Sequence, residues 1–267
     1  MIINLHLLDA CDFRCTHCFA HFGTRKTLSC KDWRTIVDNI MESINVERFN
    51  LAGGEPLLYG GLAELVEYIR SKGKAVSIIT NGYSLSDQKI DLLSEYGVSM
   101  IGLSIDSPNA STLRKLGRCT ASGNILDPDR CVSLCRRIRA RDISLKINTV
   151  ISQLNWTEDF SSFIRYALPS RWKLLKIKEF KNDFFDNTSL LINNTQFNNF
   201  ILRHRSIPHV VEMTMANSYI MIDAFGNLVD TSSNDNTPVA NLLSVSFRDA
   251  FVRLKFDYDT YYARYAA

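Results

Sequence analysis

Short apolar runs alternate along this chain with longer segments of helical periodicity, and this alternation restricts the fold more than any other feature. Strands are expected at residues 2–8, 47–52, 75–80, 99–105, 143–151 and 172–179. Helices are expected between them at residues 31–44, 61–72, 86–96, 128–141 and 157–167. Strands that alternate with helices indicate βα units and a parallel sheet, so the fold class is α/β. Six strands are fewer than the eight of a closed α/β barrel.

The length and composition suit a single globular domain with a sizeable core. The chain has 267 residues, of which 46% are apolar, and a net charge of +3 that is too small to indicate nucleic-acid binding by itself. It has no run of about 18 apolar residues and no secretory signal at its start, so no membrane partner is expected. Seven cysteines without an export signal indicate a cytoplasmic protein that uses thiols for metal binding or catalysis.

Three cysteines follow the first predicted strand in the pattern C-x3-C-x2-C, at Cys11, Cys15 and Cys18. Four-iron clusters are usually held by four thiolates, and no fourth cysteine lies nearby in the sequence. A cluster with three protein ligands leaves one iron open, and an open position is what a metal site needs to bind and activate a substrate. The alternative is a structural zinc site, for which His17 or His21 can supply a fourth ligand.

A second motif, Gly53-Gly54-Glu55-Pro56, follows the second predicted strand. The glycines allow a close approach of the backbone to a ligand or a positive φ, and Glu55 can accept hydrogen bonds from an ammonium group. The alternative is a plain turn at the end of a strand. Because active sites of α/β barrels lie at the carboxyl ends of the strands, both motifs are expected on the same rim.

Small polar residues also end the third and fourth strands on this rim. Asn81 follows the third strand, and Ser104 and Asp106 end the fourth. Each can form hydrogen bonds with a ligand, although Asn-Gly is also a common turn pair. The polar segment 107–127 is expected to be a loop and carries Arg118, which can pair with a carboxylate; a solvated loop is the alternative.

Cations and an amide lie on the fifth and sixth strands. Lys146 and Asn148 share a face because side chains alternate along a strand, and so do Arg171 and Lys173. Buried lysines are costly unless they are paired, so several cations in one interior imply a ligand with several negative charges, such as a phosphate chain. The alternative is an edge strand whose lysines face water.

The C-terminal part of the chain is more polar and less regular. Residues 181–216 contain one helix candidate at 195–205, and residues 219–230 predict a β-hairpin. Tyr219, at the start of the hairpin, can bring a phenol towards the open side of the barrel, or it can be a packed core tyrosine. The aromatic tail at 246–267 either packs over the barrel or contacts a partner.

Four further cysteines raise the question of a second cluster: Cys30, Cys119, Cys131 and Cys135. Two of them lie four residues apart on a predicted helix, and no cysteine follows residue 135. We therefore favour buried small hydrophobic residues over a second metal site.

The cysteine pattern and the Gly-Gly-Glu-Pro motif together resemble the signature of radical S-adenosylmethionine (SAM) enzymes. Further segments resemble the viperin family, in particular its short prokaryotic members: 50–57, 76–82, 146–151, 171–173 and 217–223. The resemblance spans residues 4 to about 230. It implies a partial (β/α)6 radical SAM barrel over residues 1–180, and an extension over residues 181–267 that completes the substrate site within a single compact unit.

The resemblance also implies a role for each candidate residue. Cys11, Cys15 and Cys18 would hold one [4Fe-4S] cluster. SAM would lie against Phe19, Gly53, Gly54, Glu55, Asn81, Ser104, Asp106 and Arg118. A nucleoside triphosphate would bind Lys26, Lys146, Asn148, Arg171 and Lys173. Tyr219 would be placed to protonate the leaving hydroxyl.

In this family a 5′-deoxyadenosyl radical removes the 4′ hydrogen of a nucleoside triphosphate, and the 3′ hydroxyl leaves as water. The resemblance therefore implies a lyase that converts CTP, UTP or GTP to a 3′-deoxy-3′,4′-didehydro nucleotide for defence against phage, with a flavodoxin or ferredoxin as electron donor. The alternatives are another radical SAM enzyme, of peptide or cofactor biosynthesis, and a non-catalytic iron–sulfur interaction protein. A cysteine-rich C-terminal domain, which many peptide-modifying members carry, is not present in this sequence.

Overall fold

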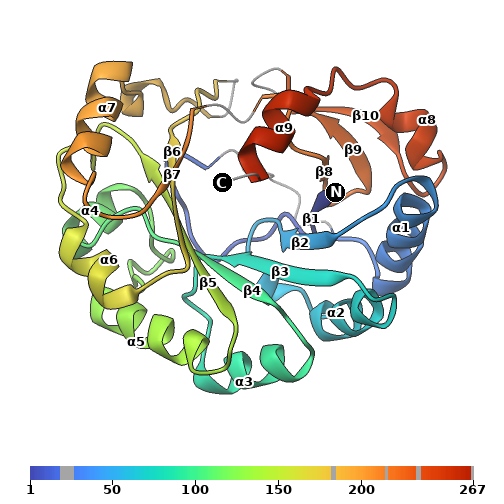
Figure 1. Cartoon of the computed structure of the whole chain (residues 1–267), viewed down its shortest axis with the longest axis horizontal. Coiled ribbons are helices and arrows are strands. Elements are labelled where there is room, and N and C mark those ends of the chain that lie inside the picture. The colour runs from blue at the N-terminus through green and yellow to red at the C-terminus, as the bar shows by residue number, and fades with distance from the viewer. Residues whose placement is uncertain (19–26, 182–184, 214–215, 233–235, 266–267) are drawn as a thin grey trace.

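The computed structural model describes residues 1–18, 27–181, 185–213, 216–232 and 236–265. Its strands are β1 (Ile2–His6), β2 (Arg48–Ala52), β3 (Ala75–Thr80), β4 (Met100–Ser104), β5 (Ser144–Ile151), β6 (Arg171–Lys176), β7 (Val210–Glu212), β8 (Met221–Ile222), β9 (Asn227–Asp230) and β10 (Thr237–Asn241). They form one sheet in the order β10-β9-β8-β1-β2-β3-β4-β5-β6-β7. β1 to β6 are parallel neighbours in chain order, and the sheet curves into a partial barrel (Figure 1), which confirms the predicted fold class.

The helices are α1 (Cys30–Ser43), α2 (Leu62–Ser71), α3 (Asp87–Glu95), α4 (Ala110–Lys115), α5 (Pro128–Arg139), α6 (Ser161–Ala167), α7 (Asn194–Arg203), α8 (Phe247–Phe251) and α9 (Tyr258–Tyr265). Helices such as α1, α2, α3 and α5 cover the outer face of the sheet, whereas α9 lies in front of the strands (Figure 1). Short 3-10 turns lie at Pro56–Leu58 and Thr188–Leu190. Ser29 and Asp32 form a capping box at the start of α1. The buried face of α1 consists of Trp33, Ile36, Val37 and Ile40, which pack in the core.

The C-terminal extension continues the same sheet at both of its edges. β7 pairs with β6 in parallel, and β8 pairs with β1 in parallel, so the first strand of the chain is an interior strand. β8 and β9 are antiparallel, which confirms the predicted hairpin, and β10 extends it. α7 confirms the helix expected at 195–205.

Some short elements differ from the expectation based on sequence. The prediction of a loop over residues 107–127 is wrong in part, because this segment contains α4. β7 and the two helices of the aromatic tail, α8 and α9, were not expected either. α4 has six residues and β7 three, which is too short for a hydrophobic period to be recognised.

Helix α9 covers the end of the barrel at which the strands begin, and it is drawn in front of the strands in Figure 1. The Tyr261 hydroxyl accepts a 2.6 Å hydrogen bond from the Ile2 amide at the start of β1. The Arg264 carbonyl accepts a 2.9 Å hydrogen bond from Arg171 at the start of β6, and the Arg264 side chain donates to Ser218 just before β8. The aromatic tail therefore packs on the barrel as a floor, opposite the cysteine rim.

Candidate active site

A cavity of about 300 Å³ lies within the barrel and brings together most residues that the sequence singles out. The predicted site residues that line it are Cys11, Cys15, Cys18, Gly53, Gly54, Asn81, Ser104, Asp106, Arg118, Lys146, Asn148, Arg171, Lys173 and Tyr219. Phe19 and Lys26 lie outside the described residues. Thus the cysteines of the rim and the cations of β5 and β6 face one continuous space.

The cysteine loop is held in place by the segment that follows α4. The Arg14 amide donates to the Gly117 carbonyl at 3.2 Å, and the Thr16 amide donates to the Leu116 carbonyl at 2.9 Å. Gly117 has a φ of +66°, and a Cβ atom there would lie 2.1 Å from the Arg14 carbonyl oxygen. Only glycine allows this approach, so the sequence Leu116-Gly117 is part of the support of the cysteine loop.

The three thiols of the rim fit an iron–sulfur cluster. Hydrogen-bond donors already point at two of the sulfur atoms, from the Phe13 amide to Cys11 at 3.4 Å and from Arg118 to Cys15 at 3.6 Å. Burial raises the pKa of Cys11 to about 12 and also raises the pKa of Cys15, so the free thiols stay protonated until a metal replaces the proton. Soft thiolates with such donors are the ligand type that iron–sulfur clusters use.

Within the described part of the chain, no three His, Cys, Asp or Glu side chains converge as ligands of a single metal ion. A four-iron cluster does not need that convergence, because each thiolate binds a different iron atom. His17, a possible fourth zinc ligand, lies with its Nε2 atom 3.1 Å from Asp106 Oδ2 instead. His21 lies outside the described residues. Of the four further cysteines, Cys131 and Cys135 are buried in the core, as expected, and Cys30 and Cys119 are half-buried.

Both glycines of the second motif face the backbone of the cysteine loop. Gly53 has a φ of +136°, and a Cβ atom on Gly54 would lie 2.1 Å from the Ala10 carbonyl oxygen. The Gly54 amide donates to the Leu8 carbonyl at 2.7 Å, and the Glu55 amide donates to the Ala10 carbonyl at 2.8 Å. The motif therefore fixes the rim by a close approach between two loops, and it lines the cavity at the same time.

Glu55 lies behind the cavity wall and is only 1% exposed. Its carboxylate accepts hydrogen bonds from the Thr80 hydroxyl at 2.7 Å, the Asn81 amide at 2.8 Å and the Leu57 amide at 3.1 Å. Burial raises the pKa of Glu55 to about 7, against the opposing effect of these hydrogen bonds. The carboxylate ties the second loop to the end of β3, and its contact with the SAM ammonium group stays a prediction.

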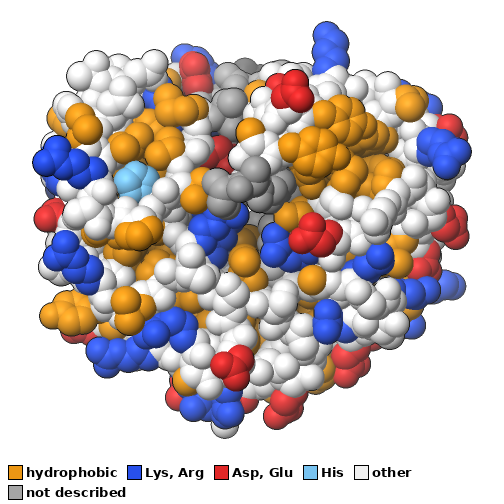
Figure 2. Space-filling view, in the orientation of Figure 1, with side chains coloured by type: hydrophobic (Ala, Val, Ile, Leu, Met, Phe, Trp, Pro, Cys, Tyr) orange, Lys and Arg blue, Asp and Glu red, His pale blue; other side chains and the backbone are white. Residues whose placement is uncertain are grey.

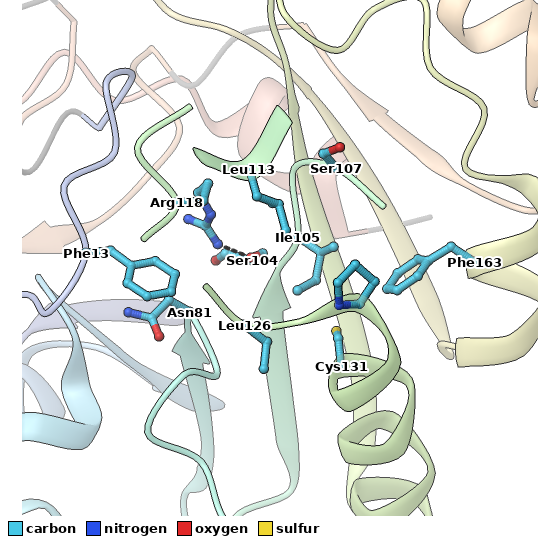
Figure 3. A pocket seen from close by; sticks show the side chains of 11 residues that line it. Phe13, Asn81, Ser104, Ile105, Ser107, Leu113, Arg118, Leu126, Cys131 and Phe163 are labelled. Carbon is cyan, nitrogen blue, oxygen red and sulfur yellow. Dashed lines mark hydrogen bonds between the residues drawn. The ribbon is translucent and has the colours of Figure 1, made fainter. Parts of the chain in front are cut away.

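Arg118 connects the end of β4 with the cysteine loop. Its Nε atom lies 3.3 Å from Asp106 Oδ2, and its guanidinium group also donates to the Ser104 carbonyl. Burial opposes the charge of Asp106, but Arg118 and His17 outweigh burial, so the pKa of Asp106 lies below its usual range. Figure 3 shows Arg118 beside Phe13 and Ser104 in a small hollow that shares these residues with the main cavity. Asp106 thus holds Arg118 and His17 in place.

Cations from three strands face the deeper part of the cavity: Arg48 of β2, Lys146 of β5, and Arg171 and Lys173 of β6. Burial, together with the charges of Lys173, Arg171 and Arg48, lowers the pKa of Lys146 to about 7. Burial also lowers the pKa of Lys173. So many cations around one cavity favour a polyanion as the ligand.

Three charged residues in or directly beside this cavity were not expected from the sequence. Arg48 begins β2 on the same face as Asn50, so the period of two along that strand was a usable signal. Glu212 ends β7 and pairs with Lys173, and Arg264 reaches Glu212 from α9 at 3.3 Å. No local pattern marks these last two residues, because their partners are far away in the sequence.

Comparisons with known proteins agree with this geometry. Residues 5–159 match the family model of the radical SAM superfamily. A protein of Selenomonas ruminantium named S-adenosylmethionine-dependent nucleotide dehydratase is 36% identical over 272 residues, and the match covers 99% of this chain and 98% of the relative. The S-adenosylmethionine-dependent nucleotide dehydratase RSAD2 of Oncorhynchus mykiss is 27% identical, covering 96% of this chain and 76% of the relative.

The fold is similar to that of a solved structure. Streptococcus suis SuiB bound to S-adenosylmethionine superimposes with a TM-score of 0.73 at 15% identity, covering 98% of this chain and 67% of SuiB. This similarity concerns the fold. Over the described ranges, every helix is too short or too polar to cross a membrane.

Proposed function

We propose that this chain, which belongs to the radical SAM superfamily and within it to the S-adenosylmethionine-dependent nucleotide dehydratases, removes water from a nucleoside triphosphate. The product is the 3′-deoxy-3′,4′-didehydro analogue of CTP, UTP or GTP. The observation that carries the proposal is the shared cavity, which has three thiols at its rim and a group of cations deeper in the barrel. One ligand can therefore reach the cluster side and the cationic side together.

The enzymes of this superfamily use a [4Fe-4S] cluster and SAM, and when bound these supply a 5′-deoxyadenosyl radical that removes a hydrogen atom from the substrate. In this chain Cys11, Cys15 and Cys18 would hold the cluster. Asn81, Ser104 and Arg118 line the adjoining wall, and their amide, hydroxyl and guanidinium groups suit the polar groups of SAM.

The cationic part of the cavity suits the triphosphate. Arg171 offers a planar fork for bidentate contacts, whereas Lys146 and Lys173 act as point charges and Arg48 extends the positive surface. Asn148 lies opposite Lys173 in the pairing of β5 with β6, so its amide can donate to the same group. This arrangement holds the phosphate chain and leaves the ribose between the cations and the rim.

Tyr219 is the proton donor that we assign to the leaving hydroxyl. Its hydroxyl lines the cavity and accepts a 2.8 Å hydrogen bond from Lys173 Nζ. The ammonium group of Lys173 can return a proton to the phenol oxygen after the transfer. A positioned acid of this kind prevents a hydroxide from leaving unprotonated.

The biological setting belongs to the same proposal. The resemblance to viperins supports a role in defence against phage, because a nucleotide without a 3′ hydroxyl ends the synthesis of viral nucleic acid. A cytoplasmic location suits a substrate that is part of the nucleotide pool. The electrons would come from a small acidic protein of the flavodoxin or ferredoxin type.

The test is anaerobic turnover of the reconstituted protein with SAM, dithionite and one nucleoside triphosphate at a time, analysed by mass spectrometry. We expect 5′-deoxyadenosine and, for one of CTP, UTP or GTP, a product lighter by the mass of one water. Cys15→Ala is the control, and it should lose the cluster and form neither product. Slow release of 5′-deoxyadenosine with all the nucleotides intact would reject the dehydratase while leaving the radical SAM family in place.

A further inference from the structure

A carboxylate lies among the cations of the nucleotide site. Glu212, at the end of β7, is 7% exposed. Its Oε2 atom forms an ion pair with Lys173 and a second one with Arg264 Nε at 3.3 Å. Its Oε1 atom accepts a 2.8 Å hydrogen bond from the Tyr219 hydroxyl. A buried carboxylate is tolerated only when such partners compensate for the lost water, so Glu212 depends on all three contacts.

These contacts fix the direction of the hydroxyl of Tyr219. Lys173 donates to the phenol oxygen at 2.8 Å, and the phenol has one proton, which it donates to Glu212. The hydroxyl is therefore held between a charged donor and a charged acceptor. Charge-assisted hydrogen bonds are stronger than neutral ones, so Glu212 and Lys173 together hold the phenol more firmly than neutral partners would.

Helix α9 supplies the fourth member of this group. The Arg264 guanidinium lies over the ring of Tyr219, with its central carbon 3.8 Å from the ring centroid. The same side chain donates to the carbonyl and the hydroxyl of Ser218, the residue before Tyr219. Arg264 thus contacts the ring, the preceding backbone and the carboxylate that binds the phenol, and only 5% of its side chain is exposed.

The charge of Glu212 acts against the ligand that the neighbouring cations suit. Lys173, Arg171 and Arg264 line the cavity with basic side chains, and Lys146 joins them when it is protonated. A carboxylate in the same group repels a phosphate chain, so its presence weakens binding of that ligand. Glu212 opposes binding of the phosphate chain, and yet it is held by three charged or polar partners. We therefore expect it to have a role other than holding the phosphates.

We propose that Glu212, anchored by Arg264 of α9, is a positioning residue that holds the phenol of Tyr219 beside the ammonium group of Lys173. In the reaction the phenol proton turns from Glu212 to the leaving hydroxyl, which departs as water, and Lys173 returns a proton to the phenol oxygen. This inference rests on the proposed function, because it assigns Glu212 to the proton donor of that reaction. Glu212 does not touch the reacting atoms and acts through Tyr219 and Lys173. Its negative charge lowers the affinity for the triphosphate, and its hydrogen bond orients the phenol of Tyr219.

The first test is Glu212→Gln, which keeps the shape of the side chain and removes one negative charge. Inorganic tripolyphosphate, titrated calorimetrically at pH 6 where Lys146 is mostly protonated, should bind about three- to tenfold more tightly. The kcat for the nucleotide that the wild-type protein dehydrates should fall by about tenfold or more, because a neutral amide holds Tyr219 and Lys173 less firmly. A merely structural role would weaken binding and turnover together.

Arg264→Gln gives a second variant with the opposite change in charge. It should bind tripolyphosphate about threefold more weakly, since one cation is lost, and its kcat should also fall. The double variant Glu212→Gln/Arg264→Gln should bind tripolyphosphate about as well as the wild type and remain slow. Glu64→Gln is the matched control, because Glu64 is exposed on α2 and pairs with Arg34, so this change removes the same charge from the surface.

The outcomes separate this inference from the proposed function. A wild-type protein that dehydrates no nucleotide overturns the proposed function. An active wild type overturns only the inference if Glu212→Gln loses binding in parallel with kcat, or changes neither. If circular dichroism shows that Glu212→Gln does not fold, the double variant Glu212→Gln/Arg264→Gln decides: wild-type binding of tripolyphosphate with a low kcat supports the inference, and a parallel loss of binding and kcat rejects it.

Discussion

Lys146 shows how a single residue can adapt to an arriving polyanion. Burial is the main reason for its lowered pKa of about 7, and Lys173, Arg171 and Arg48 add to the effect while Glu212 opposes it. Near pH 8 this side chain is therefore neutral in most molecules of the unliganded protein. A triphosphate beside Lys146 favours the charged form and raises the pKa again, so binding at that pH must take up a proton.

Calorimetric titration of the unreduced protein with its nucleotide, in two buffers of different ionisation enthalpy, measures this uptake. At pH 8 we expect an uptake approaching about one proton from Lys146, and much less at pH 6, where the lysine is already charged. Lys146→Gln should lower the uptake at pH 8 and weaken binding by about tenfold at pH 6.

Lys181→Gln is the control for that measurement. Lys181 is an exposed lysine that pairs with Asp186, and its replacement should change neither the affinity nor the proton count. Equal uptake by the wild type and Lys146→Gln at pH 8 would show that Lys146 does not meet the phosphates.

Among the elements, the barrel strands were predictable from the sequence, but the contacts that hold the cysteine loop and the short strand β7 were not. Strands such as β3 and β5 are apolar runs with turn residues at their ends, and the period of two along a strand correctly predicts that Lys146, Asn148 and Lys173 face the interior. The Thr16 hydroxyl of the cysteine loop donates to the Leu116 carbonyl, 100 residues later in the chain. We call this contact between the cysteine loop and residues 116–119 the clamp. No local pattern in the sequence reports such a contact. Glu212 was not predictable either, because a strand of three residues has no period.

The clamp itself leads to a prediction for Gly117→Ala. A Cβ atom at this position would lie 2.1 Å from the Arg14 carbonyl oxygen, so the cysteine loop has to move away from α4. We expect a reconstituted variant with less than about half of the wild-type iron content and weaker absorbance of the iron–sulfur cluster, since the thiols lose their arrangement. Iron analysis and visible absorbance measure both quantities.

Gly123→Ala provides a matched comparison for Gly117→Ala. Gly123 also has a positive φ, of +81°, but a Cβ atom there meets open space. Its replacement should cost about 1 kcal/mol of folding free energy and leave the iron content unchanged. If both variants load iron as the wild type does, the contact between the two loops is not needed for the cluster.

At the scale of the whole molecule, the extension joins distant parts of the chain into one body. Figure 2 shows hydrophobic side chains gathered over α8 and α9, where the aromatic rings of the tail contact one another. The Tyr261 hydroxyl binds the amide of Ile2, 259 residues earlier. The tail is therefore fixed to the first strand, and we expect the sheet and the aromatic tail to unfold together.

Tyr261→Phe tests this connection. Tyr261 is 3% exposed, and the change leaves the buried amide of Ile2 without an acceptor, so the free energy of unfolding should fall by about 1–3 kcal/mol. Denaturant unfolding followed by circular dichroism measures the loss. The neighbouring change Tyr262→Phe removes an exposed hydroxyl and should have little effect. Equal stability of the two variants would show that the bond to Ile2 contributes nothing.

The place of α9 in the chain also sets an order of events during synthesis. The cysteine loop and its clamp at residues 116–119 are made early, so a growing chain contains the ligands of the cluster before the barrel has its last strands. β8, which flanks β1, and α9, which closes the floor, follow much later. A chain that still lacks α9 has the cations of the barrel without the arginine that anchors Glu212. If Arg264 and Glu212 have the role proposed above, the capacity to act on nucleotides arises only after α9 has left the ribosome, well after the metal ligands have emerged.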